Sequence, residues 1–340
     1  MPLAVIPGSQ GYRNLKSKAS WWPGRVDGED NRVEPIAKPE YMPTFQLIPG
    51  EPVFTVGSCF ARFIEVYLGR NGYQVPMASY KPKEEGDSLG LMNKFSPYSV
   101  LNEFQWALDP DFANFDQRRA LCSEGGELWM DTQLVSKLAL SEERAMARRF
   151  EVNGLFKLVK DCRIVILTLG LVEAWYDTKN RIYLNTSVSH YMQKYDPDRF
   201  ELHVLSFKEL YDCTRRTIEL ILKYGHPEAR VLLTVSPVAL TATFTGQDVM
   251  VANMYSKSAL RTVAEHIWRE FDEVDYLPSY ESVMLSDRKR AFQKDLIHVQ
   301  AELVSSNVNR MIERYTEAKT PDLSIDEAKK ALAEMSDQAE

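Results

Sequence analysis

Residues 163–170, Arg-Ile-Val-Ile-Leu-Thr-Leu-Gly, form an almost continuous apolar run. A strand of this kind is buried on both faces, which is typical of a parallel sheet covered by helices on each side. Similar runs at residues 52–56 and 230–237 predict two further buried strands, and residues 274–277 predict a short edge strand. The chain is therefore expected to form a mostly parallel sheet.

Amphipathic segments separate these strands. Apolar residues three and four apart predict helices over residues 60–68, 99–108, 141–159, 207–224, 253–271 and 301–315, and a second strand is predicted at residues 73–75. Such alternation predicts an α/β fold, a three-layer α/β/α domain with a doubly wound sheet. Ligands bind beyond the carboxyl ends of the strands in such folds, so Gly57, Gly170 and Ser236 are expected to share one crevice.

Three segments are predicted along the 340 residues. Residues 1–50 are rich in proline, glycine and charge and are interpreted as an arm packed on the domain, whereas residues 51–318 form the domain itself. Residues 319–340 are interpreted as a charged helical or frayed tail. The sequence gives no indication of the oligomeric state.

Composition excludes some classes of function. A hydrophobic content of 44% suffices for a large core, and a net charge of −7 argues against a nucleic-acid partner. The first residues are too short and proline-rich for a signal peptide, and no apolar run approaches membrane-spanning length, so a cytoplasmic location without a membrane span is expected. The four cysteines lack CxxC spacing, so neither a metal site nor a disulfide framework is predicted.

The turn Gly57-Ser58-Cys59 joins the first predicted strand to a helix. A helix N-terminus offers unpaired N–H groups and the positive end of the helix dipole, which stabilise an anion. This position suits the nucleophile of an acyl-transfer reaction, and the dipole is expected to lower the pKa of the Cys59 thiol. A turn of small residues that simply packs tightly is the structural alternative.

Asp295 and His298 are the remote partners of this turn. A carboxylate three residues before a histidine can accept the Nδ1 proton, which leaves Nε2 to act as a base toward a nucleophile.

Two other motifs receive structural interpretations. Gly86-Asp87-Ser88-Leu89 spells a lipase-like signature, but the charged residues before it cannot form a buried strand, so a surface loop is predicted. Lys257 is expected to be exposed at the start of a helix, although it could instead reach the crevice and meet an anionic donor.

Several ordered blocks resemble the GSCFA family, a branch of the SGNH hydrolase-like superfamily, over about residues 50–315. They are Phe54-Thr55-Val56-Gly57-Ser58-Cys59-Phe60-Ala61, Thr168-Leu169-Gly170-Leu171-Val172-Glu173-Ala174-Trp175, Thr234-Val235-Ser236-Pro237-Val238, Tyr255-Ser256-Lys257-Ser258-Ala259, Leu277-Pro278-Ser279-Tyr280-Glu281 and the pair Asp295 and His298. The resemblance implies an SGNH or flavodoxin-like sheet and acyl or ester chemistry, with a nucleophile after the first strand and an Asp-x-x-His near the end.

The resemblance also implies roles for single residues. Aligned on the glycine, Cys59 takes the nucleophile position, as in capsule-polysaccharide acyltransferases that carry Gly-Asn-Cys, and Ser58 is its hydrogen-bonding neighbour or the alternative nucleophile. Many relatives have an asparagine after the middle strand as an oxyanion donor, but this chain has Glu173 there. Asn93 is the best replacement donor, or a cap of the next helix. Glu173 binds a substrate hydroxyl or a basic side chain, and Trp175 stacks on a sugar or covers the core.

These expectations combine into a hypothesis with one alternative. The chain is expected to be an O-acyltransferase or carbohydrate esterase for polysaccharide or glycolipid precursors, with no tightly bound cofactor and acyl-CoA as a possible donor. The alternative is an inactive SGNH-like module that binds a glycan within a biosynthetic assembly, which the missing asparagine favours. A metal-dependent phosphoesterase would need clustered aspartates and histidines that the sequence lacks.

Overall fold

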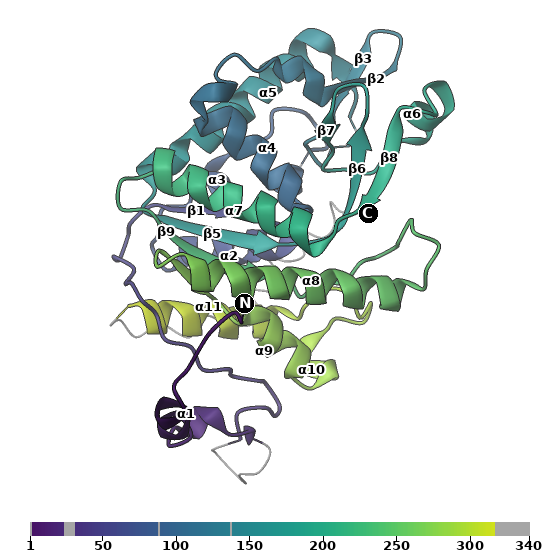
Figure 1. Cartoon of the computed structure of the whole chain (residues 1–340). Helices are drawn as coiled ribbons and strands as arrows, with labels where there is room; N and C mark the ends of the chain where they lie inside the picture. The colour runs from purple at the N-terminus through teal and green to yellow at the C-terminus, as the bar shows by residue number, and fades with distance from the viewer. Residues whose placement is uncertain (1, 24–30, 88, 137, 317–340) are drawn as a thin grey trace.

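The computed structural model describes residues 2–23, 31–87, 89–136 and 138–316 (Figure 1). Its central sheet contains four parallel strands in the order β1-β5-β9-β10. These strands are β1 (Val53–Val56), β5 (Ile164–Leu169), β9 (Arg230–Val235) and β10 (Val274–Tyr276). The predicted α/β fold with a mostly parallel, doubly wound sheet is therefore confirmed, and all four strands lie where the apolar runs placed them.

The strand predicted at residues 73–75 is reduced to a single parallel bridge between Pro52 and Gln74. The Val53 N–H donates to the Gln74 carbonyl at 2.8 Å, and the Gln74 N–H donates to the Glu51 carbonyl at 3.3 Å. If this bridge is counted as the second strand along the chain, the order across the sheet is bridge-β1-β5-β9-β10, which is the flavodoxin-like order 2-1-3-4-5. The order reverses between β1 and β5, so the edge beyond these two strands is where a ligand is expected.

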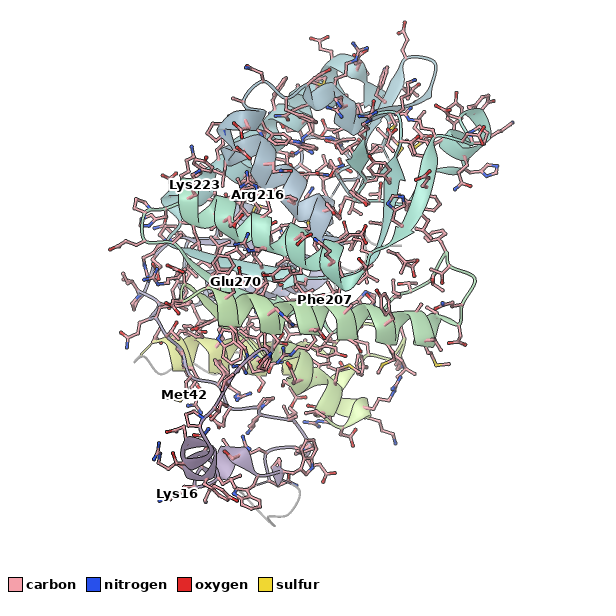
Figure 2. All side chains as sticks on the ribbon, in the orientation of Figure 1. Lys16, Met42, Phe207, Arg216, Lys223 and Glu270 are labelled. Atoms are coloured by element: carbon pink, nitrogen blue, oxygen red, sulfur yellow. The ribbon has the colours of Figure 1, made fainter. Side chains whose placement is uncertain are left out.

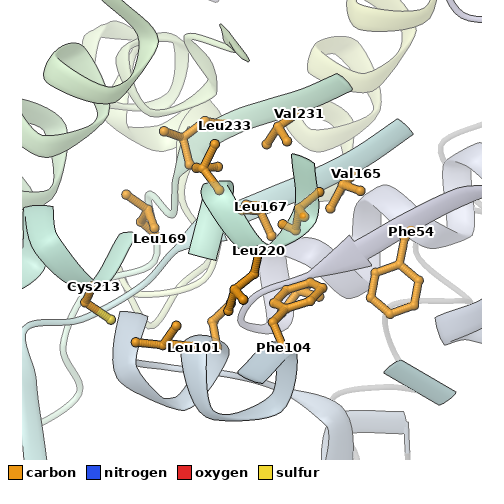
Figure 3. Close-up of a cluster of buried hydrophobic side chains, with 14 of the residues drawn as sticks. Phe54, Leu101, Phe104, Val165, Leu167, Leu169, Cys213, Leu220, Val231 and Leu233 are labelled. Atoms are coloured by element: carbon orange, nitrogen blue, oxygen red, sulfur yellow. The ribbon is translucent and has the colours of Figure 1, made fainter. Parts of the chain in front are cut away.

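Alternation along the buried strands divides the interior into two cores. Phe54, Val165 and Val231 face one layer of helices and belong to the cluster drawn in Figure 3. Their neighbours Val53 and Ile164 face the opposite layer. Because both faces are apolar, the sheet needs helices on both sides, which is why the sequence forms three layers.

Each face of the sheet is covered by its own set of helices. The face of Phe54 is covered by α4 (Pro97–Leu108), α5 (Glu142–Lys157), α7 (Phe207–Tyr224) and α8 (Val249–Glu270). The opposite face is covered by α2 (Cys59–Arg70), α9 (Ser279–Leu285), α10 (Arg288–Ala291) and α11 (Ala301–Tyr315). Helices α7 and α8 lie side by side in Figures 1 and 2, and Arg215 pairs with Glu270 across them at 2.7 Å.

Two small antiparallel sheets were not predicted. One has the order β2-β3-β4 and the other β7-β6-β8. Their strands are β2 (Leu121–Gly125), β3 (Leu128–Asp131), β4 (Leu140–Ser141), β6 (Glu173–Asp177), β7 (Ile182–Tyr183) and β8 (Phe200–Val204). The shorter elements are α3 (Pro76–Ser79), α6 (His190–Tyr195), η4 (Leu89–Met92), η5 (Pro110–Phe112), η6 (Gln117–Ala120) and η7 (Leu158–Asp161). Because β6 follows β5 after a short turn, this second sheet continues from the carboxyl edge of the parallel sheet.

The N-terminal segment has two parts. Helices α1 (Gly8–Asn14) and η1 (Lys18–Ser20) bury no side chain. Further along, buried Asp275 of β10 accepts hydrogen bonds from the Thr44 N–H at 2.9 Å, the Thr44 hydroxyl at 2.8 Å and the Tyr315 hydroxyl at 2.8 Å. Asp275 thus ties the segment around Thr44 and the end of α11 to the sheet. The tail predicted at residues 319–340 lies outside the described residues. None of the described helices is long and apolar enough to cross a membrane.

Candidate active site

The turn after β1 holds Gly57, Ser58 and Cys59 at the switch point of the sheet. Gly57 has a φ of 157°, and a Cβ there would lie 2.5 Å from Thr168 Cβ and 2.9 Å from the Thr168 carbonyl oxygen. Only glycine allows this approach of β1 to β5, because any side chain would collide with the neighbouring strand. Cys59 follows as the first residue of α2, so its thiol lies at the helix N-terminus.

Ser58 links the turn to the third parallel strand. Its side chain makes no capping bond to α2, and its hydroxyl instead donates to Ser236 Oγ at 3.2 Å. The Ser236 N–H in turn donates to the Leu169 carbonyl at 2.8 Å. Both serines are buried. The structure therefore brings the predicted residues after β1, β5 and β9 together at one edge.

The environment of Cys59 differs from the expectation in one respect. Cys59 is partly exposed, but burial of its thiol raises the pKa above the ordinary value of 9.0. The Phe60 N–H, the Ser58 hydroxyl and the charge of Lys257 act in the opposite direction and lower the pKa of the thiol. The expected net lowering of the pKa is wrong, because desolvation exceeds the effect of the helix N-terminus.

Lys257 corrects the prediction of an exposed lysine. Helix α8 begins at Val249, four residues earlier than predicted, and Asp248 caps it. Lys257 therefore lies inside the helix and is only 2% exposed, and its Nζ donates to the Gly170 carbonyl at 2.8 Å. Burial lowers the pKa of Lys257 to about 7, while the charge of a Cys59 thiolate would raise it. The amine thus reaches the turn after β5 from the side of α8.

Residues 94 and 95 bond to the turns after β1 and β5. The Lys94 N–H donates to the Gly57 carbonyl at 2.8 Å, and the Leu171 N–H donates to the Phe95 carbonyl at 2.7 Å. A Cβ at Gly170 would collide with the same Phe95 carbonyl. The glycines after β1 and β5 are therefore held by one short segment of chain.

Asn185 holds this segment, and sequence reasoning missed it. Its Nδ2 donates to the Asn93 carbonyl at 2.8 Å, its Oδ1 accepts from the Phe95 N–H at 2.9 Å, and its own N–H donates to the Thr132 carbonyl at 2.9 Å. A single asparagine in a loop is ordinary turn composition, so no local pattern reveals this role.

A buried network of charges holds Lys94 itself. Its Nζ is 2.5 Å from Glu103 Oε1 and donates to the Gln133 carbonyl at 2.5 Å. Glu103 also pairs with Arg149, which is 3.2 Å from Asp131 Oδ2. All four charged side chains are almost fully buried and balance one another. Sequence reasoning missed this network too, because its members come from four separate segments.

Asn93 lies beside the turn, and one atom of its side chain is unpaired in the described chain. It directly precedes Lys94, and its Oδ1 is buried without a hydrogen-bond partner within the described chain. The alternative that it caps the next helix is wrong, because Ser96 caps α4 by accepting from the Ser99 N–H at 3.2 Å. Buried polar atoms are seldom left unpaired, so the Asn93 Oδ1 can accept a hydrogen bond from a bound molecule.

Asp295 and His298 form the predicted pair in the turn before α11. His298 Nδ1 lies 2.6 Å from Asp295 Oδ2, and Asp295 Oδ1 accepts the N–H groups of Ile297 and His298 at 3.0 and 3.1 Å. Partial burial acts to raise the pKa of Asp295, but these hydrogen bonds outweigh it and hold the pKa below its ordinary value. The imidazole is 43% exposed, and within the described chain no hydrogen bond joins it to Cys59.

Glu173 and Trp175 lie on β6, which follows the turn after β5. The Glu173 carboxylate accepts the Thr243 hydroxyl at 2.5 Å and the Phe244 N–H at 3.1 Å, so it orders the loop after β9. Trp175 packs edge-on to Phe244 with ring centroids 5.4 Å apart, and Phe244 is exposed. Within the described chain, the partners of Glu173 are thus a hydroxyl and a backbone group.

The remaining sequence candidates lie elsewhere. Residues 80–87 contain no strand, Asp87 pairs with buried Arg148 at 2.8 Å, and Ser88 lies outside the described residues. Across the part of the chain that the structure describes, no group of three or more His, Cys, Asp or Glu side chains could hold a metal ion.

Comparison with known proteins identifies a family. The model of the GSCFA family matches residues 52–311, which include every element of the parallel sheet and the crevice residues described above. No curated protein and no solved structure matches the chain significantly.

Proposed function

The chain belongs to the GSCFA family, and we propose from the geometry of its Cys59 turn that it is an SGNH-like enzyme of acyl transfer. The observation that carries the proposal is the thiol at the first residue of α2, beside the switch point of the sheet. N–H groups at this end of the helix are placed to stabilise the negative oxygen of a tetrahedral intermediate. Cys59 acts as the nucleophile and Ser58 orients it.

Two further groups complete the proposed chemistry. His298, oriented by Asp295, takes the proton of the acceptor hydroxyl or water that resolves the acyl-enzyme. The N–H groups of the Asn93 amide supply an oxyanion donor in place of the asparagine that Glu173 replaces, which is supported by the position of Asn93 directly before Lys94, whose N–H donates to the Gly57 carbonyl. His298 must approach Cys59 for this step, and its exposure permits movement of the ring.

The proposed substrates are an acyl donor and a carbohydrate. We propose acyl-CoA as the donor and a cytoplasmic location, because thioester-to-thiol exchange is nearly isoenergetic and the compartment keeps thiols reduced. The acceptor is a hydroxyl of a polysaccharide or glycolipid precursor. The exposed ring of Phe244 beside Trp175 offers an aromatic surface of the kind that stacks on sugars.

The test is formation of the acyl-enzyme. Incubation with radiolabelled acetyl-CoA should label the peptide that contains Cys59, and Cys59→Ala should abolish the label while Ser58→Ala reduces it. His298→Ala should accumulate label, because resolution fails while attack by Cys59 continues. Label on neither Cys59 nor Ser58 would contradict the transferase.

A glycan-binding module without catalysis is the second candidate. The observation that favours it is the exposed imidazole that makes no hydrogen bond to Cys59 within the described chain. Measuring glycan-array binding and turnover for the wild type and for His298→Ala separates the two candidates. If the protein is a binding module, the wild type shows no turnover and the variant keeps its glycan affinity. If it is an enzyme, the variant loses turnover.

A further inference from the structure

We propose that Lys257 is the proton acceptor for the Cys59 thiol, which leaves His298 and Asp295 to serve the acceptor hydroxyl. The geometry divides the two bases. Lys257 enters from α8 and is anchored at the Gly170 carbonyl, directly beyond the strand that contacts Gly57. His298 lies on an exposed turn of the opposite layer and is engaged with Asp295.

The surroundings of Lys257 suit a neutral amine. Its side chain is nearly fully buried, and its one hydrogen bond is to a neutral carbonyl. Cys59 is the group whose charge acts on Lys257, and no carboxylate does so within the described chain. A neutral amine donates an N–H to the Gly170 carbonyl and keeps a lone pair for another proton. With a pKa of about 7, part of the Lys257 population carries that lone pair at neutral pH.

Other charged groups near the thiol do not replace Lys257. Arg62 of α2 is buried and is influenced by Cys59, but it pairs with Glu65 at 2.8 Å, and a guanidinium does not release its proton to become a base. Glu65 is occupied in turn by Arg62 and by the Thr55 hydroxyl. On the same side of the sheet α2 packs against α11, and in the turn before α11 Asp295 and His298 bond to each other.

The proton balance of the first step is complete with these groups. As the Cys59 sulfur bonds to the acyl carbon, its proton passes to Lys257, and the carbonyl electron pair moves to the oxygen. When the tetrahedral intermediate collapses, the bond to the donor thiol breaks, and the departing thiolate takes the proton from the Lys257 ammonium. Lys257 returns to the neutral amine, and Cys59 is acylated. These reaction steps rest on the proposed acyl transfer. The removal of the Cys59 proton by Lys257 does not, because any reaction of the thiol requires it.

Alkylation of Cys59 by iodoacetamide tests the inference without any substrate. In that reaction the sulfur displaces iodide and the thiol proton passes to Lys257. The rate at the Cys59 peptide, measured by mass spectrometry on the full chain, should rise through about pH 7 and level off above it, as Lys257 becomes neutral. Lys257→Met should lose this step and react at least about tenfold more slowly at pH 8, because the thiol then needs hydroxide to ionise.

Matched variants complete the design. His298→Ala should keep the wild-type alkylation profile, and Lys160→Met, which changes an exposed lysine, should do the same. The buried thiols of Cys122, Cys162 and Cys213 report unfolding, because they should stay unlabelled in every folded variant. A Lys257→Met profile like that of the wild type, or a loss of the step in His298→Ala instead, would overturn the inference. Failure of acyl transfer alone would leave it standing.

Discussion

Replacing Lys257 with methionine will raise the stability of the protein at neutral pH and remove part of its pH dependence. Burial lowers the pKa of Lys257 from the ordinary 10.5 to about 7. The difference of about 3.5 units, at about 1.4 kcal/mol per unit, costs the folded state about 5 kcal/mol at a pH well below 7. Methionine has a similar length and carries no charge to desolvate, so it avoids this cost and gives up one hydrogen bond of about 1 kcal/mol.

The sign of the pH dependence follows from the same pKa. Between pH 7 and pH 9 the unfolded chain keeps Lys257 protonated, whereas the folded protein has mostly released the proton. Unfolding therefore takes up a proton, and the free energy of unfolding contributed by Lys257 rises with pH, by about 2 kcal/mol across this window. Lys257→Met should lack this rise.

Urea unfolding at pH 7, 8 and 9 measures the effect. The difference in the free energy of unfolding between Lys257→Met and the wild type should be a few kcal/mol at pH 7 and shrink by about 2 kcal/mol at pH 9. Lys160→Met, on an exposed lysine, should follow the wild type at every pH. A difference that stays constant from pH 7 to pH 9 would refute the reasoning, because a purely steric effect has no pH dependence.

Two further predictions concern the framework of the site. Gly57→Ala should destabilise the protein by about 1–3 kcal/mol in urea unfolding, because its Cβ collides with Thr168. Gly154→Ala, in an open position on α5, should be neutral or stabilising. Equal effects of the two variants would disprove the close approach of Gly57 to Thr168. Glu103→Gln should lower the free energy of unfolding by about 3–5 kcal/mol, because Lys94 and Arg149 lose their shared carboxylate. Glu302→Gln, in an exposed pair with Arg290, should change it by at most about 1 kcal/mol. Similar losses from the two glutamates would contradict the network.

The parallel sheet was predictable because its signal is local. The strand at Ile164–Leu169 is a run of apolar residues, and helix α7 has the bounds that the apolar spacing gave it, with a capping box at Ser206 and Glu209. The small antiparallel sheets were missed although β8, at Phe200–Val204, alternates apolar and polar residues. Its five residues are only partly buried, so the alternation is a weaker signal than a continuous run.

The position of Lys257 shows where sequence reasoning went wrong and what could have corrected it. Asp248 is a helix-capping residue, and starting α8 after it would have placed Lys257 well inside the helix instead of near its start. Lys257 also precedes Leu260 by three residues and Ala264 by seven. Both of these are buried, so Lys257 lies on the inward stripe of the helix. By contrast, the bonds of Lys94 to Gln133 and of Asn185 to Phe95 join distant segments, and only the folded chain brings them together.

The segment that Asn185 holds has a consequence for how mutations will act. The peptide groups of residues 94 and 95 bond both to the nucleophile turn and to the turn after β5. Their support comes from Asn185 in the loop after β7, Gln133 in the turn after β3 and Glu103 of α4. The loops that follow β3 and β7 thus help to fix the shape of the two turns. Substitutions there will present as defects of reaction rate, although they lie remote from every atom that reacts.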